Sequence, residues 1–433
     1  MKLLLLLIVI FPHLVAFPQN KTNKVNWKSD SDWVNLRKEA LTTNRYIFVD
    51  CIASWCLPCK QMDQKVYSKE VVINALKPLI PIKLRIDTIK TKNIKSGMTR
   101  NAANGLSRQY HIEEFPTFLF FSPTGELVHK SIGYKNVDQF LQLIQNGIDS
   151  SKQYYTLKKK YEVGTIALAA IPYLAQCARE VGDTSFANSA ACKYIDSYLT
   201  NNPEKLFTRD NLGFIRDFIH VIHSGTKIFP ELLANASKAD TISGDPAFSS
   251  DIIDYVVWKE QIKPPYDSSK ISGKEPAWTR LTENIRAQYG EVVADRNVLS
   301  AKLNWFSFKK DWRKEREVFV QKVEKYGLDT SGFKWVVTNN KIWKLFVEHV
   351  SDMAELTRAI SWMEIIKKDH VDPSIIDTYA NLLYKAGKFK EAIQWETKAA
   401  AVESDLAQAD NRPYDETYEQ TLHKMETRQL TWD

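Results

Sequence analysis

Glycine and proline are scarce in this sequence, which has 15 and 16 of them among 433 residues. Disordered chains are enriched in such residues and poor in hydrophobic ones, whereas here the hydrophobic content of 44% and the charged content of 26% are those of globular proteins. The composition therefore argues against long disorder. Because one hydrophobic core seldom organises a chain of this length, we expect two or more domains.

Long apolar runs are lacking beyond the N-terminus, so we expect no transmembrane segment in the mature chain. At the N-terminus, Met1-Lys2 precedes the apolar run Leu3–Phe11, which is short for a bilayer span and typical of a signal peptide. We expect residues 1–16 to be a cleaved signal peptide, the alternative being an uncleaved anchor. The mature protein is then exported, to the periplasm or the extracellular space.

Unbroken runs of five or more like charges are also lacking, although the formal net charge is +7. Basic residues are interleaved with acidic ones, as in the stretch 309–317, and such a run is typical of a solvated helix face. Together with export, this interleaving argues against nucleic acid as a partner.

Cysteine is sparse, with five residues, and one pair forms a Cys-x-x-Cys motif at Cys56 and Cys59. The other three cysteines provide no second motif and no histidine lies nearby in sequence, so the four ligands of a structural zinc site are lacking and we expect no metal. A purely structural disulfide is compatible with export. It explains neither Trp55 nor a strand that leads directly into a helix.

A redox pair accounts for the neighbours of these cysteines. An apolar strand expected over 46–51 leads into a helix that starts near Cys56, and the positive end of a helix dipole stabilises a thiolate. Cys56 is therefore the expected nucleophile, and Cys59, one turn later, can attack the mixed disulfide and release the substrate. Pro58 suits the first helical turn, and Lys60 can add positive potential, although an exposed lysine is equally common there.

Residues 25–150 alternate expected helices and strands, which predicts an α/β domain. The basic stretch 90–100 is expected to be a surface loop inserted in this domain. Beyond the motif we expect a strand at 81–86, a helix at 102–110, a hairpin of strands at 118–121 and 126–132, and a closing amphipathic helix at 137–148.

Residues 151–433 lose the strand pattern and show helical periodicity, as in 312–326, which predicts an all-α domain. An Ala-Ile-x-Trp pattern at Ala359 recurs at Ala392, 33 residues later, close to the period of a helical-hairpin repeat. Residues 374–402 resemble a tetratricopeptide repeat most clearly. We expect degenerate tetratricopeptide-like repeats, which can present a surface for a peptide or protein partner.

Three features of the α/β domain together resemble the thioredoxin family. They are the Trp-Cys-Leu-Pro-Cys-Lys motif at 55–60, Asp50 six positions before its first cysteine, and the Glu-Phe-Pro-Thr-Phe stretch at 114–118. The domain is especially similar to the thioredoxin-like C-terminal domain of the bacterial transmembrane thiol-disulfide reductase. The resemblance covers about a quarter of the chain and implies a thioredoxin fold for it.

The resemblance also implies roles for individual residues. Pro116 would be a cis-proline that faces the two sulfurs and presents backbone to an extended substrate. Asp50 would be a buried carboxylate that exchanges protons with Cys59, the alternative being an ordinary carboxylate at a strand end. Gly133 would allow backbone to pass close to the site.

Two positions next to the motifs depart from thioredoxin. Leu57 and Phe115 stand where thioredoxin has smaller residues, and both positions influence redox poise and substrate choice. The direction of electron flow is therefore left open, with Trp55 and Phe115 expected to support substrate binding.

The remaining cysteines have structural interpretations. Cys51 alternates with Asp50 along the strand and is expected to point into the core as a small hydrophobe. Cys177 and Cys192 lie on either side of an expected turn near Asp183, so either a structural disulfide or two free thiols is compatible with their positions.

Taken together, these features predict an exported thiol-disulfide oxidoreductase of the reductase or isomerase type, acting in cell redox homeostasis. The Cys56–Cys59 disulfide is the redox-active centre and no other cofactor is expected. Its partners would be protein thiols or disulfides and a protein that donates or accepts electrons. The alternative is a non-catalytic assembly factor that uses the helical repeats and keeps the thioredoxin domain as a scaffold.

Overall fold

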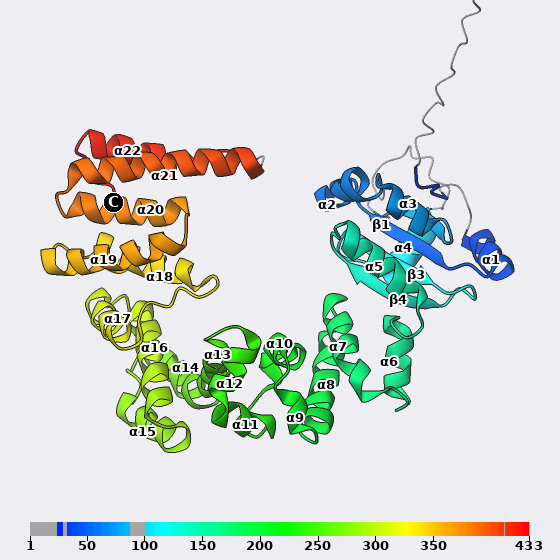
Figure 1. Cartoon of the computed structure of the whole chain (residues 1–433), viewed down its shortest axis with the longest axis horizontal. Helices are drawn as coiled ribbons and strands as arrows, with labels where there is room; N and C mark the ends of the chain where they lie inside the picture. The colour runs from blue at the N-terminus through cyan, green and yellow to red at the C-terminus, as the bar shows by residue number, and fades with distance from the viewer. Residues whose placement is uncertain (1–23, 29–32, 87–99, 411, 433) are drawn as a thin grey trace, which may run out of the picture. The chain divides into compact units, whose positions relative to one another are not determined.

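The computed structural model describes residues 24–28, 33–86, 100–410 and 412–432. The expected signal peptide at 1–16 lies outside these residues, as does the expected loop at 90–100 except for Arg100, which begins a helix. The chain divides into two compact units, Met1–Asn202 and Pro203–Asp433. Figure 1 shows the elements of each.

The first unit contains a four-stranded sheet in the order β2-β1-β3-β4. The strands β1 (Ile47–Ile52) and β2 (Ile80–Arg85) are parallel, β3 (Thr117–Phe121) is antiparallel to β1, and β4 (Leu127–Ile132) is antiparallel to β3. The central strands β1 and β3 are largely apolar because both faces of the sheet are covered.

Alternation along the strands divides the core into two layers. Val49, Cys51 and Leu119 pack under α1 (Trp33–Thr43) and α4 (Arg100–Gln109). Phe48 and Phe118 pack on the opposite face, under α3 (Glu70–Leu76) and α5 (Val137–Ile148). The α/β domain expected from the sequence is confirmed, and the buried Cys51 is a core residue as predicted.

Three helices follow the α/β domain within the first unit: α6 (Tyr154–Glu162), α7 (Ile171–Glu180) and α8 (Thr184–Tyr194). Both α6 and α7 contact β4, the edge strand of the sheet. The first three helices beyond residue 150 therefore share a compact unit with the sheet.

The second unit is all-helical, and in the described part of the chain no strand follows Ile132. Its α-helices are α9 (Pro203–Leu206), α10 (Arg209–Asp217), α11 (Ile228–Ala234), α12 (Ala236–Ser243), α13 (Phe248–Val257), α14 (Lys263–Ser272), α15 (Trp278–Tyr289), α16 (Glu291–Lys309), α17 (Trp312–Tyr326), α18 (Lys334–Ile342), α19 (Met353–Asp369), α20 (Pro373–Lys385), α21 (Phe389–Asp410) and α22 (Thr417–Glu426). The helix expected at 312–326 is confirmed as α17.

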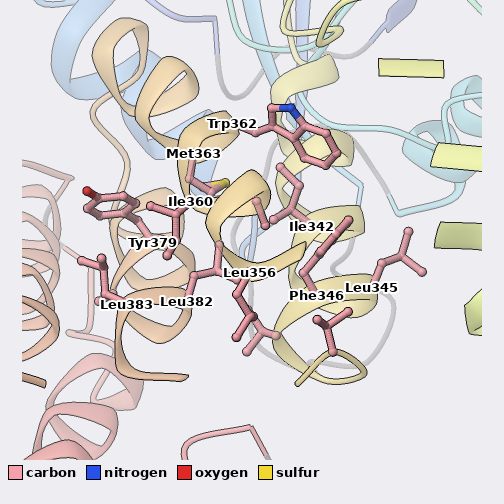
Figure 2. Packing of buried hydrophobic residues seen from close by; sticks show 14 of the residues in the cluster. Ile342, Leu345, Phe346, Leu356, Ile360, Trp362, Met363, Tyr379, Leu382 and Leu383 are labelled. Carbon is pink, nitrogen blue, oxygen red and sulfur yellow. The ribbon is translucent and has the colours of Figure 1, made fainter. Parts of the chain in front are cut away.

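The last helices of this unit pack around a large apolar core. Figure 2 shows Phe346, Trp362 and Leu382 converging from neighbouring helices, and all three are buried. The helices α20 and α21 form the expected helical hairpin, and the turn between them uses Gly387 with a φ of +77°. Ala380 and Ala392 are fully buried, since small side chains let the two helices approach closely.

Candidate active site

The two motif cysteines lie where β1 gives way to a helix. Cys56 is the N-cap of α2 (Leu57–Gln61), which continues without a break into the helical turns of η1 (Met62–Val66). The Cys59 backbone N–H donates to Cys56 Sγ over 3.1 Å. The two sulfurs are bonded at 2.05 Å. A sulfur that receives an amide hydrogen bond at a helix N-terminus is favoured as a thiolate once the bond is reduced.

Around this disulfide the surface is apolar. Cys56 and Cys59 are only 2% and 5% exposed, whereas the flanking Trp55 and Leu57 are 69% and 64% exposed. Phe115 packs against the cluster of Ala53, Cys56 and Cys59, and its ring meets that of Trp55 edge to face, with centroids 5.7 Å apart. The redox pair is therefore bordered by side chains that can contact an apolar partner.

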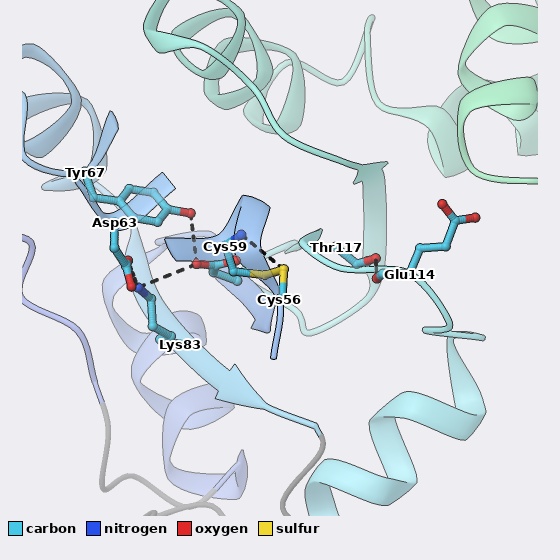
Figure 3. The surroundings of a disulfide bond; sticks show 8 residues. Cys56, Cys59, Asp63, Tyr67, Lys83, Glu114 and Thr117 are labelled. Carbon is cyan, nitrogen blue, oxygen red and sulfur yellow. Dashed lines mark hydrogen bonds and ion pairs between the residues drawn. A yellow bond between two sulfur atoms is a disulfide. The ribbon is translucent and has the colours of Figure 1, made fainter. Parts of the chain in front are cut away.

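The segment that carries Phe115 has the cis-proline that the resemblance to thioredoxin implies. The Phe115–Pro116 peptide bond is cis. The Thr117 hydroxyl donates to the Glu114 carbonyl over 2.7 Å, and Figure 3 shows both residues beside the disulfide. The Gly133 N–H donates to the Pro116 carbonyl over 2.8 Å. The structure thus brings Gly133 to Pro116, two segments that are separate in the sequence.

Glycine at position 133 is explained by its backbone. Its φ is +86°, a conformation that costs other residues energy, and a Cβ built there would meet no atom within 4 Å. Close packing is therefore not the reason for the glycine, and the space beside it is open.

Asp50 is a buried carboxylate inside β1. It is 1% exposed and pairs with Lys83 of β2 and Phe118 of β3, so it does not lie at a strand end. Its Oδ2 accepts a hydrogen bond from the Tyr67 hydroxyl at 2.9 Å and lies 3.9 Å from Lys83 Nζ. Its Oδ1 is buried without a hydrogen-bond partner.

Burial raises the pKa of Asp50 to about 7, against the opposing effects of Lys83 and the Tyr67 hydrogen bond. A carboxyl group with that pKa can accept or release a proton near neutral pH. This property suits the proton exchange that the resemblance implies for Asp50.

Three residues that surround Asp50 were not identified from the sequence. They are Tyr67, Lys83 and Asp63, which Figure 3 shows grouped on one side of the disulfide. Lys83 forms ion pairs with both Asp50 and Asp63, and its ammonium lies 4.9 Å from the centre of the Tyr67 ring. The sequence could have indicated Lys83, because a lysine inside an apolar strand is unusual. No local pattern indicates that Tyr67 contacts Asp50.

Four other residues singled out in the sequence are Pro58 and Lys60, next to the disulfide, and the cysteines Cys177 and Cys192. Pro58 is in the first turn of α2, as expected, and Lys60 is exposed on the same helix. Cys177 and Cys192 are free thiols, so the disulfide that their positions allowed does not form in this structure. Burial raises the pKa of Cys177 to about 11 and also raises that of Cys192, which keeps both thiols protonated at neutral pH.

The described residues hold neither a cluster of metal ligands nor a helix that could span a membrane. No three His, Cys, Asp or Glu side chains in that part of the chain are grouped as metal ligands would be. None of the described helices combines the length and apolarity needed to cross a membrane.

Comparison with known proteins supports the fold of this domain. Residues 35–148 match the family model of a thioredoxin-like domain. Thioredoxin of Mycoplasmoides gallisepticum is 28% identical over 107 residues, which are 25% of this chain and 89% of that protein. The α/β domain is therefore thioredoxin-like, and its bonded Cys-x-x-Cys pair is consistent with thiol-disulfide redox activity. The family match ends with α5, so the helices beyond it lie outside the match.

Proposed function

We propose that this protein is an exported thiol-disulfide oxidoreductase that reduces or isomerises disulfides of other proteins. The observation that carries the proposal is the Cys56–Cys59 disulfide at a helix N-terminus, next to the cis bond before Pro116 and in the same domain as a buried carboxyl group, Asp50. A scaffold would need none of these features, whereas disulfide exchange uses each of them.

The reaction begins with the reduced pair. The Cys56 thiolate attacks one sulfur of a substrate disulfide, forming a mixed disulfide and releasing the first substrate thiol. Cys59 then loses its proton, which Asp50 accepts, and its thiolate attacks Cys56 Sγ. The second substrate sulfur leaves as a thiolate, which takes up the proton that Asp50 accepted, and the Cys56–Cys59 disulfide forms, so two electrons have passed to the substrate. A donor protein with a dithiol of its own returns the pair to the reduced state.

Substrate binding relies on the apolar border and on the open space beside Gly133. Trp55, Leu57 and Phe115 offer contact to the side chains that flank a substrate cysteine. The Gly133 N–H is already bonded to the Pro116 carbonyl, which holds the two segments together, and the open space beside Gly133 leaves room for an extended segment of the substrate.

Segments outside the thioredoxin-like domain support a location and a role in partner binding. Residues 1–16 have the pattern of a signal peptide, which supports export to the periplasm or the extracellular space. The second unit recruits a substrate or a partner protein, and its α20–α21 hairpin supports a tetratricopeptide-like repeat, since small residues lie at the crossing and a glycine at the turn.

The test is turnover of a synthetic peptide with one intramolecular disulfide, using dithiothreitol as the electron donor. Cys56→Ser should abolish turnover, and Cys59→Ser, reduced and then mixed with the peptide after the dithiothreitol is removed, should accumulate the mixed disulfide. Cys192→Ser, at a half-buried free thiol, is the matched control and should leave turnover intact. Turnover that survives in Cys56→Ser would support the non-catalytic assembly factor instead.

The reduction potential of the pair decides the direction of electron flow. A value near roughly −270 mV indicates a reductase, whereas a value near about −120 mV indicates an oxidant that inserts disulfides.

A further inference from the structure

The end of β4 and the residues after it are held by a helix outside the thioredoxin-like domain. We call residues 131–135 the Gly133 loop. The hydroxyl of Ser131, a buried residue, donates to Oε1 of Glu180, the last residue of α7. Lys135 Nζ donates to the same oxygen over 2.9 Å and to the Ile132 carbonyl over 2.8 Å. Glu180 thus joins both ends of the Gly133 loop.

At neutral pH the Glu180 carboxylate is charged. Burial alone would raise its pKa, but the hydrogen bonds from Ser131 and Lys135 outweigh that effect and lower the pKa. The side chain is 42% exposed, so the ion pair with Lys135 is partly screened by water. The hydrogen bond from the buried Ser131 hydroxyl is less affected by solvent.

The same loop contacts the redox site. The N–H of Gly133 donates to the Pro116 carbonyl, and the neighbouring Phe115 packs on the cluster that contains Cys56 and Cys59. A continuous series of contacts therefore runs from Glu180 through the Gly133 loop to the cis-proline segment and the disulfide.

Helix α7 can hold the loop only if α7 is itself fixed to the thioredoxin-like domain. It contacts β4 and also α6, and α6 is bonded to the domain. The Tyr154 N–H donates to Nδ1 of the buried His129 over 3.0 Å, and burial lowers the pKa of His129 to about 4, which keeps this nitrogen a neutral acceptor. The amide of the buried Gln153 donates to the Gly147 carbonyl over 3.0 Å. These bonds attach the start of α6 to β4 and α5.

We propose that Glu180 is a positioning residue that fixes the Gly133 loop for the backbone of an extended disulfide substrate, so that α7 is part of the redox unit. This inference rests on the proposed function and deepens it. It assigns a task to a helix that lies beyond the match to the thioredoxin-like family.

The activity test uses the full chain with Glu180→Ala and Glu180→Gln. The substrates are the disulfide peptide, which needs the loop, and 5,5′-dithiobis(2-nitrobenzoate), a small disulfide that does not. We expect Glu180→Ala to raise KM for the peptide about two- to fivefold, the range of a screened ion pair, with kcat and the rate on the small disulfide unchanged. Glu180→Gln should have a smaller effect because its amide oxygen still accepts from Ser131. Glu162→Gln, an exposed acid at the end of α6, is the control.

A second readout does not depend on activity. The Gly133 amide should exchange its hydrogen faster in Glu180→Ala than in the wild type, while the reduction potential of the Cys56–Cys59 pair stays the same. Unchanged peptide KM together with unchanged Gly133 exchange would overturn the inference, as would an equal loss on both substrates. A wild-type protein that reduces neither disulfide refutes the proposed function, and Gly133 exchange then still decides whether Glu180 positions the loop.

Discussion

Replacing Asp50 by asparagine should make the thioredoxin-like domain more stable at neutral and alkaline pH while slowing the reaction. Burial raises the pKa of Asp50 from its ordinary 3.8 to about 7. A raised pKa means that the folded state favours the protonated form, so the free energy of unfolding is highest below about pH 4. It falls as the pH rises from about 4 to about 7, because ionisation is then harder in the folded than in the unfolded chain.

The size of this effect follows from the two pKa values. The interval between 3.8 and about 7 corresponds to about 4 kcal/mol of unfolding free energy, at 1.36 kcal/mol per pH unit. Asparagine keeps the shape of the side chain and can still accept the Tyr67 hydrogen bond, but it does not ionise. We therefore expect Asp50→Asn to stabilise the domain by up to about 4 kcal/mol at pH 8 and by far less near pH 4. Turnover should fall by about 100-fold or more, as expected when a general base is lost.

Hydrogen exchange of the β1 amides is the assay, compared between wild type and variant at each pH from 5 to 8. A local probe is needed because a chain of two compact units does not unfold in one step. Asp63→Asn is the matched control, since Asp63 pairs with the same Lys83 but its side chain is 50% exposed. A stabilisation by Asp50→Asn that stays constant from pH 5 to pH 8 would refute this reasoning.

Two further predictions concern buried groups. Tyr67→Phe removes a hydrogen bond that lowers the pKa of Asp50, so the pKa of Asp50 should rise. The pH–rate profile of turnover should therefore shift to higher pH by about one unit. A profile that coincides with that of the wild type would contradict this. In the second unit, Asp377 of α20 and Glu396 of α21 interact, and burial raises the pKa of each. The free energy of unfolding of this helical hairpin should therefore fall as the pH rises through these pKa values. Asp377→Asn should therefore slow exchange of the α20 amides more at pH 8 than at pH 6, with the exposed Glu391→Gln as control, and equal effects at the two pH values would contradict a raised pKa of Asp377.

Much of the redox motif could be predicted because its chemistry is local in the chain. An apolar strand that runs into a helix beginning at Cys56 follows from residues 46–61 alone, and the closing helix at 137–148 follows from its apolar periodicity. The cis bond before Pro116 followed from a resemblance rather than from any pattern, since X-Pro bonds are mostly trans.

Local patterns could not show which side chains meet across the fold. Asp50 and Lys83 are neighbours because of the register between β1 and β2, which a period-two pattern does not specify. Tyr67 contacts Asp50 because the helix after the motif packs on that face of the sheet.

The sequence by itself determined the order of domains, the placement of Cys56 at a helix N-terminus and the burial of Cys51, because each depends on a few consecutive residues. Only the tertiary structure decided that Cys177 and Cys192 stay unbonded and that Glu180 meets Ser131, 49 positions away in the chain. Such pairings depend on how whole helices pack against the sheet, and helix packing is a collective result of many side chains.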